Sequence, residues 1–316
     1  MEYKQTTDHV LMVRPVAFGF NAETAENNYY QNAPQSDSDD EIQRKALAEF
    51  DSFVSKLRAN DIKVTVVEDS KTTDTPDSIF PNNWVSFHAD GHIVIYPMFA
   101  ENRRLEKRRE VIDELIHTNN FNSTGETDFS YFESEGRFLE GTGSLILDRP
   151  NRMVYASVSE RMDQQALKAF CEKMNYRPVV FHAMQDFEGQ RKPIYHTNVM
   201  MCLGNSFAVI CLECIDDIRE RETVVAKIEG SGKEVIPISE KQVNSFAGNM
   251  LEVYNRNSER LLVMSTAAYE SLNDAQLSKL SEHCRIIHSD LSTIENHGGG
   301  SARCMMAEVY LPKLPE

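Results

Sequence analysis

RFLEGTGSLILDRPNRMVYASVS, residues 137–159, contains two apolar segments on either side of the short polar turn RPN. Apolar segments of this length around a Pro- and Asn-containing turn predict two antiparallel strands. The residues that follow predict a helix from about Asp163 to Met174 and then a strand in RPVVFHA, residues 177–183. This part of the chain is therefore expected to form a strand–strand–helix–strand (ββαβ) unit.

The same order of elements recurs along the chain about five times, without sequence identity between the copies. The expected strand pairs are NWVSFH with HIVIYPMF, NVMMCL with SFAVICLE, and NMLEVYN with RLLVMSTA, and a first strand lies in VLMVRP. The expected helices cover residues 41–59, 102–117, 216–228 and 268–280, and the strands after them include 62–67, EVIPIS and RIIHSD. A repeat of nearly 60 residues favours a closed, pseudo-symmetric α/β fold, because each unit must be covered by its neighbours.

Polar residues that can take part in catalysis or binding recur at the same place in each unit. Asn83, Glu140, His196, Asn249 and Cys304 lie at or just before the first strand of a unit, 57, 56, 53 and 55 positions apart. If the units surround an axis, equivalent positions converge near that axis. We therefore expect these five residues to share one cleft.

Composition limits the range of functions. The chain has 316 residues, 41% of them hydrophobic, and 33 basic against 49 acidic residues give a net charge of −16. An acidic protein is poorly suited to bind nucleic acid or an anionic membrane, and no segment is long and apolar enough for a membrane span. We expect a cytoplasmic protein with a small-molecule partner, and a homo-oligomer is compatible with the sequence. Six sparse, irregularly spaced cysteines are expected to be free thiols, with Cys211 and Cys214 buried in a strand.

Cys304, His196 and Glu140 supply the groups that covalent catalysis by a thiol needs. A thiolate is a good nucleophile, and a histidine oriented by a carboxylate can move the protons. The glycines Gly298, Gly299 and Gly300 lie just before the cysteine and let the backbone approach a ligand closely with free amide groups. We therefore expect an accessible cleft around Cys304. A flexible surface turn is the alternative for the glycines, and a zinc site is the alternative for the three side chains.

The motifs FLEGTGSLILD, YHTNVMMCLG, FAGNMLEV and GGGSARCMMAEVYLP resemble, in this order, the signatures of the guanidino-group-modifying enzymes. This superfamily includes arginine deiminase, dimethylarginine hydrolase, succinylarginine dihydrolase and the amidinotransferases. RPVAFGFNAETAENNYYQ and PDSIFPNNWVSFH are most similar to a bacterial branch linked to citrulline utilisation. The resemblance covers nearly the whole chain and implies a five-bladed α/β-propeller of pseudo-fivefold ββαβ units, forming a single catalytic domain over residues 1–316.

The resemblance also implies the roles of the site residues. Cys304 is expected to be the nucleophile, His196 the general acid and base, and Glu140 the carboxylate that orients the histidine or holds a substrate nitrogen. No metal and no organic cofactor is expected. The related transferase chemistry, which passes an amidino group to an amine, uses the same residues and is kept as an alternative, as is a non-catalytic binding module.

Two asparagines depart from the deiminase pattern and indicate the substrate. The deiminases carry aspartates where this chain has Asn83, in FPNN, and Asn198, in HTN. Amides carry no charge and can both donate and accept, which suits a neutral ureido group better than a guanidinium. We therefore expect a hydrolase of citrulline that gives ornithine, ammonia and carbon dioxide, with an arginine deiminase-like activity as the alternative.

The remaining conspicuous residues receive weaker interpretations. Asp77, Asn21 and Asn249, together with Gly299 and Gly300, are candidate substrate contacts. His88 and His92 flank the turn ADG and are interpreted as exposed turn residues. The charged run ENRRLEKRREVIDEL, residues 101–115, is interpreted as a solvated helix face.

Overall fold

The computed structural model describes residues 3–314, and its strands form five three-stranded sheets and one two-stranded hairpin. In each three-stranded sheet the first two strands are antiparallel and the last two are parallel. Parallel neighbours need a crossover connection, and in every sheet that connection carries a helix. The ββαβ order expected from the sequence is therefore present.

One sheet joins the two ends of the chain. Its strands are β17 (Ala307–Glu308), β1 (His9–Arg14) and β2 (Lys63–Glu68), in that order. Val10 pairs with Glu308 in the antiparallel register and with Val64 in the parallel register. The segment after Cys304 thus supplies the first strand of a sheet whose other strands come from the beginning of the chain.

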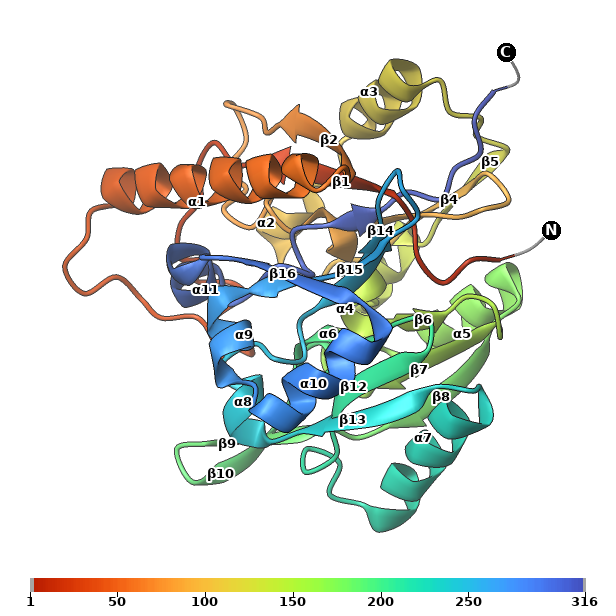
Figure 1. Cartoon of the computed structure of the whole chain (residues 1–316). Helices are drawn as coiled ribbons and strands as arrows, with labels where there is room; N and C mark the ends of the chain where they lie inside the picture. The colour runs from red at the N-terminus through yellow and green to blue at the C-terminus, as the bar shows by residue number, and fades with distance from the viewer. Residues whose placement is uncertain (1–2, 315–316) are drawn as a thin grey trace.

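The other sheets follow each other along the chain (Figure 1). Their strands are β3 (Val85–Phe87), β4 (His92–Ile95) and β5 (Gly125–Asp128); β6 (Ile146–Asp148), β7 (Met153–Ser157) and β8 (Arg177–Phe181); β11 (Met201–Leu203), β12 (Phe207–Cys211) and β13 (Glu234–Ile238); and β14 (Leu251–Tyr254), β15 (Arg260–Ser265) and β16 (Arg285–Ser289). The hairpin of β9 (Met184–Phe187) and β10 (Gln190–Pro193) was not expected from the sequence.

The crossover helices α1 (Asp39–Ala59), α3 (Arg109–Asn119), α5 (Gln164–Met174) and α7 (Ile218–Gly230) lie at the periphery of the molecule (Figure 1). Side-chain caps define the starts of three of them: Ser38 accepts from the amide of Glu41, and Asp163 and Asp217 each accept from two amides of the first turn. The short helices are η1 (Pro81–Asn83), α2 (Glu101–Arg104), η2 (Ser130–Glu135), α4 (Gly141–Ser144), α6 (Thr197–Met200), α8 (Glu240–Val243) and α11 (Ser292–Gly298).

Two expected helices are interrupted. The helix predicted over residues 102–117 is divided into α2 and α3, and the break lets Arg103 and Glu106 point into the protein, where they pair with each other. The helix predicted over residues 268–280 is divided into α9 (Thr266–Ser271) and α10 (Asp274–His283). There Leu272 is extended and buried, and Asn273 caps α10 with a capping box, so the side chain competes with a continuous helix.

Buried apolar side chains form four clusters, each shared by more than one sheet. Cys211 and Cys214 are buried in the first of these clusters, as predicted, but only Cys211 lies in a strand, because β12 ends there. All six cysteines are buried free thiols. Among residues 3–314, no helix combines the length and the apolar character needed to cross a membrane.

Candidate active site

The turns that lead into the first strand of each sheet bring the polar residues of the sequence repeat together. Asn83 ends η1, Glu140 precedes α4, and His196 precedes α6. Asn249 and Cys304 lie in the turns before β14 and β17. Because α4 packs against both η1 and α6, residues from separate units meet in one place.

Glu140 and His196 form a buried hydrogen-bonded pair. His196 Nε2 lies 2.7 Å from Glu140 Oε2, and the other carboxylate oxygen accepts from the amide of Phe99 over 3.0 Å. Glu140 is fully buried and His196 is 2% exposed. A carboxylate only accepts hydrogen bonds, so the ring proton is assigned to Nε2 and the Nδ1 lone pair is left for the reaction.

Two buried guanidinium groups hold the charge of Glu140. Arg161 Nη1 lies 3.5 Å and Arg103 Nη1 lies 3.6 Å from Glu140 Oε2. Burial by itself raises the pKa of Glu140. Arg161 and the hydrogen bond from His196 nevertheless hold this pKa well below its usual value. Burial lowers the pKa of His196 to about 4, against the opposing effect of Glu140. At neutral pH the pair is therefore a carboxylate and a neutral imidazole.

The sulfur of Cys304 accepts two hydrogen bonds from side-chain amides. Asn198 Nδ2 lies 3.3 Å and Asn249 Nδ2 lies 3.2 Å from Sγ. The Asn249 side chain is itself fixed, because Nδ2 also donates to the carbonyl of Asn198 and Oδ1 accepts from the amide of Arg303. Two donors directed at one sulfur stabilise a thiolate more than a thiol.

Asn83 is oriented by Arg103. Arg103 Nη1 donates to Asn83 Oδ1 over 3.0 Å, while the rest of the guanidinium makes a two-point ion pair with Glu106 at 2.9 and 3.0 Å. The free Nδ2 of Asn83 points toward Gly143, where an added Cβ would lie 2.3 Å from Nδ2 and 2.8 Å from His196 Nδ1. Gly143 therefore makes room for Asn83 and His196 to face the same small space.

Asp77 forms a second polar group together with Asn21. Asp77 Oδ2 accepts from Asn21 Nδ2 over 2.8 Å and from Thr24 Oγ1 over 3.1 Å, and it lies 3.8 Å from Arg103 Nε. Asp77 is 2% exposed, and burial raises its pKa. Asp77 Oδ1 has no hydrogen-bond partner.

The three consecutive glycines let other groups pack closely against the turn. An added Cβ would lie 2.9 Å from the Phe80 ring at Gly298 and at Gly300, and 2.6 Å from Asn28 Nδ2 at Gly299, whose φ is +63°. The amide expected to be free at Gly299 donates to the carbonyl of Glu295, and its carbonyl accepts from the Tyr195 hydroxyl over 2.6 Å. The glycines thus form a packed turn, in contrast to the flexible surface turn considered above.

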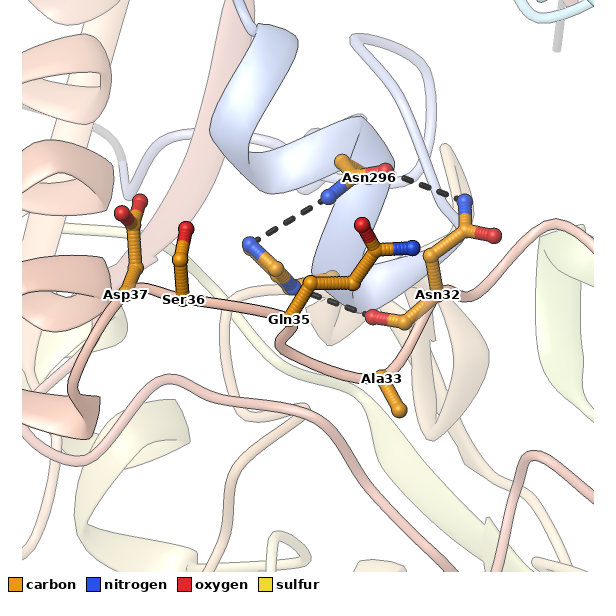
Figure 2. Close-up of a pocket in the computed structure, with 7 residues that line it drawn as sticks. Asn32, Ala33, Gln35, Ser36, Asp37 and Asn296 are labelled. Atoms are coloured by element: carbon orange, nitrogen blue, oxygen red, sulfur yellow. Dashed lines mark hydrogen bonds between the residues drawn. The ribbon is translucent and has the colours of Figure 1, made fainter.

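Residues 16–37, which we call the cover segment, close the site. Gln31 Nε2 donates to the carbonyl of Gly298 over 3.0 Å, and Arg161 Nε donates to Asn27 Oδ1 over 2.8 Å. Figure 2 shows a further contact, in which Asn32 of the segment faces Asn296 of α11, with Nδ2 to Oδ1 at 3.0 Å. Cys304 is only 2% exposed, so the accessible cleft expected from the sequence is absent from this closed conformation.

Three groups of residues were missed or misinterpreted from the sequence. Arg103 and Glu106 belong to the run interpreted as a solvated helix face, but they are 2% and 3% exposed and border the site. Arg161 was not singled out, because nothing in the surrounding residues distinguishes it from a surface arginine. His88, expected to be exposed, is buried, and its Nε2 lies 2.8 Å from Ser86 Oγ, whereas His92 is half-buried against Thr127.

The described part of the chain contains no group of three or more His, Cys, Asp and Glu side chains arranged to hold a metal ion. The arrangement is suited to chemistry by a nucleophile and a proton carrier. Cys304 lies between two amide donors, and the neutral imidazole of His196 is held by the ionised Glu140.

Comparison with protein families gives one match over most of the chain. Residues 14–311 match the sequence model of the eukaryotic N,N-dimethylarginine dimethylhydrolases. No curated protein sequence matches the chain significantly.

Solved structures with a similar fold are also found. The product-bound N-terminal domain of ArgZ, an arginine dihydrolase from the ornithine–ammonia cycle in cyanobacteria, has a TM-score of 0.73 at 17% identity, with 100% of both chains covered. An AgrE variant with L-arginine has a TM-score of 0.72 at 17% identity, over 98% of this chain and 41% of AgrE. A Pseudomonas aeruginosa DDAH variant with citrulline has a TM-score of 0.64 at 16% identity, over 98% and 100% of the two chains.

The present chain spans 41% of the length of full-length ArgZ. At these identities the similarity concerns the fold, which is the mixed α/β fold of these proteins.

Proposed function

Since the chain belongs to the N,N-dimethylarginine dimethylhydrolase family, we propose that it is a cysteine-dependent hydrolase of a ureido amino acid. Members of this family hydrolyse carbon–nitrogen bonds other than peptide bonds. The substrate we propose is citrulline, and the products are ornithine, ammonia and carbon dioxide. Cys304 is the nucleophile, His196 the proton carrier and Glu140 the carboxylate that orients it.

The observation that carries this proposal is a cluster of buried polar atoms without partners. Asn83 Nδ2 is an unpaired donor, Asn82 Oδ1, Asn198 Oδ1 and Asp77 Oδ1 are unpaired acceptors, and Ser78 Oγ can act as either. An unpaired buried polar group costs about 1–3 kcal/mol, so five in one region indicate the place of a polar ligand. A ureido group has one carbonyl oxygen and N–H donors, and it complements this set.

The charges around the amides favour a neutral group at the reacting carbon. The guanidinium of Arg103 lies directly behind Asn83, and Glu140 is already paired with Arg161 and His196. A buried guanidinium substrate needs its own anion, whereas a ureido group does not. We assign the carbonyl oxygen to Asn83 Nδ2, an N–H group to Asn198 Oδ1, and the α-ammonium group to Asp77 Oδ1.

In the first half of the reaction, Cys304 loses its proton to the free Nδ1 of His196, and the thiolate attacks the ureido carbon. The tetrahedral adduct then breaks its bond to the ornithine nitrogen, which takes the proton from His196. Ornithine leaves, and a carbamoyl group stays on the sulfur. The two amides at Sγ and the carboxylate of Glu140 stabilise the thiolate and the imidazolium, respectively.

In the second half, His196 takes a proton from a water molecule that attacks the carbamoyl carbon. The carbon–sulfur bond breaks, the proton returns to the thiolate, and the carbamic acid released decomposes to ammonia and carbon dioxide. One water is consumed for each citrulline. These steps use only groups of this chain and its substrate.

We propose that the sheets carrying this site form a five-bladed propeller, and that the propeller acts as one catalytic domain. The five sheets of equal strand order and the pairing of β17 with β1 support it, since each blade then contributes one turn to the centre.

One observation favours arginine as a second candidate substrate. Asp77 is a buried carboxylate with a free oxygen, and this oxygen is able to neutralise a guanidinium. Hydrolysis of arginine to ornithine then consumes two waters and releases two molecules of ammonia.

The test is to compare kcat/KM for citrulline and arginine while counting ornithine and ammonia. We expect citrulline to be preferred, with one ammonia per ornithine, and a rapid quench followed by mass spectrometry to find a carbamoyl group on Cys304. Cys304→Ser and His196→Ala variants with unchanged circular dichroism serve as controls and are expected to lose most turnover. A ten-fold preference for arginine, with two ammonia per ornithine, would assign the protein to the second candidate.

A further inference from the structure

A cavity of about 440 Å³ lies between the cover segment and the body of the protein. Its wall contains four aromatic rings, those of Tyr29, Tyr30, Phe187 and Phe246, and two carboxylates, Asp186 and Glu295. The other residues in the wall carry amide or hydroxyl side chains. Among the described residues that form it, none is Lys, Arg or His, and none belongs to the catalytic group described above.

The aromatic rings form two pairs, and each pair joins a tyrosine of the cover segment to a phenylalanine of the body. Tyr29 stacks on Phe187 of β9 with ring centroids 4.4 Å apart, and Tyr30 lies against Phe246 at 5.6 Å. The faces of aromatic rings carry partial negative charge, which attracts ammonium and guanidinium groups. Two ring pairs in a wall that also contains two carboxyl groups and no Lys, Arg or His therefore create an environment suited to a positive ligand.

The backbone of Phe246 is held in an unusual conformation. Its φ is +60°, in the left-handed region that a bulky side chain rarely adopts, and its side chain is 6% exposed. Such a conformation is unfavourable, and it persists where the surrounding structure requires it. The Phe246 carbonyl accepts from the amide of Asn249 over 2.8 Å, which connects this wall to a residue that touches Cys304.

Two residues of the wall carry polar atoms without partners. The Tyr30 hydroxyl and Gln185 Nε2 make no hydrogen bond in this closed conformation, and Gln185 is only 5% exposed. The hydroxyl oxygen of Tyr30 can accept a hydrogen bond, whereas Gln185 Nε2 only donates and contributes nothing to the binding of a cation.

We propose that this cavity binds a small organic cation, an ammonium or guanidinium group on a short aliphatic chain, between the cover segment and β9. The rings of Tyr29, Tyr30, Phe187 and Phe246 enclose the aliphatic part and face the cation. Asp186 supplies compensating negative charge, and Glu295 adds to it by releasing its proton to solvent when the cation binds. Because Tyr29 and Tyr30 belong to the cover segment, the bound cation joins that segment to the body and holds the catalytic site closed.

A calorimetric titration tests the proposal with a probe that has ammonium groups but no ureido group. The full chain carrying Cys304→Ser is titrated with 1,4-diaminobutane, and 1,4-butanediol, of similar shape and no charge, is the matched control. We expect the diamine to bind at least about ten-fold more tightly than the diol, because cation–π and charge contacts contribute about 1–2 kcal/mol. Hydrogen exchange of residues 29–32 should slow when the diamine is bound.

Variants then locate the binding. Tyr29→Ala and Glu295→Gln should each weaken diamine binding about five-fold or more, whereas Tyr131→Ala, which removes an exposed ring elsewhere, and Asp77→Asn, in the catalytic group, should leave it unchanged. Equal binding of diamine and diol, or no binding of the diamine, would overturn the proposal. So would loss of binding in Asp77→Asn alone, since the diamine would then occupy the catalytic site. None of these outcomes depends on whether citrulline is the substrate.

Discussion

Arg103 donates a hydrogen bond from Nη1 to Oδ1 of Asn83 over 3.0 Å, and this bond determines which end of the Asn83 amide faces the catalytic group. With Oδ1 held by the guanidinium, Nδ2 is the end that is left free. An arginine of the short helix α2 thus decides that position 83 offers the substrate a donor, which suits the oxygen of a ureido group.

Replacing this amide by a carboxylate should reverse the preference for substrate. In Asn83→Asp, one oxygen stays paired with Arg103 and the other presents an acceptor where the parent presents a donor. We expect kcat/KM for citrulline to fall at least about ten-fold and kcat/KM for arginine to rise, since a mismatched polar contact in a buried site is strongly rejected. Asn83→Ala is the control for a general loss of activity, because this variant should lose activity with both citrulline and arginine. Unchanged selectivity in Asn83→Asp would contradict the role of this amide.

The two amide donors at Cys304 predict a change in thiol reactivity. In Asn249→Asp, Oδ1 can still accept from the amide of Arg303, but a carboxylate oxygen replaces the donor that lies 3.2 Å from Sγ. We expect alkylation of Cys304 by iodoacetamide to slow about ten-fold or more, because the sulfur loses a hydrogen-bond donor and faces a like charge. Peptide mapping reports the rate, with Cys202 and Cys284 as internal controls. An unchanged rate for Cys304 would show that the donor does not stabilise the thiolate.

A single added methyl group tests whether Asn83 and His196 share one space. The Cβ of Gly143→Ala would lie 2.3 Å from Asn83 Nδ2 and 2.8 Å from His196 Nδ1, so both side chains must move. We expect kcat to fall about 100-fold or more, since small displacements of catalytic groups have large effects. Gly230→Ala, where no atom lies within 4 Å of the added Cβ, is the matched control and should keep full activity. Normal turnover in Gly143→Ala would be incompatible with this geometry.

The buried carboxyl of Glu295 predicts a pH dependence of stability. Burial raises its pKa to about 7, against the hydrogen bond from Ser301, while Glu49 and Asp290 lie near it. The folded chain then keeps a proton that the unfolded chain has lost, so stability declines as the pH rises from about 4.5 to 7. Glu295→Gln has no such proton to lose, so only the parent is destabilised. The free energy of unfolding of the variant minus that of the parent should therefore increase by about 2–3 kcal/mol from pH 4.5 to pH 8. Urea denaturation at both pH values measures the difference, and a difference that does not change with pH would contradict the expectation.

The repeated ββαβ order and the position of the polar residues within it could be predicted from the sequence. Strand pairs around short turns and the amphipathic helices α1, α5 and α7 depend on local patterns, which survive in each unit without identity between units. The spacing of Glu140, His196 and Cys304 followed from that repeat, and the structure places these residues at equivalent turns.

The tertiary structure decided what the local pattern could not. Arg103 and Glu106 look like members of a solvated helix face, and only the packing of α2 against the site shows that they are buried and paired. The closing of the site by residues 16–37 also depends on contacts between distant parts of the chain, such as Gln31 with the carbonyl of Gly298. The physical reason is that the periodicity of apolar residues indicates only on which face of a helix or strand a residue lies. Its burial and its hydrogen-bond partners depend on which other segment packs against that face. The sequence by itself thus determined the units and their chemically active positions, and only the tertiary contacts decided which charges are buried beside them and which way each amide points.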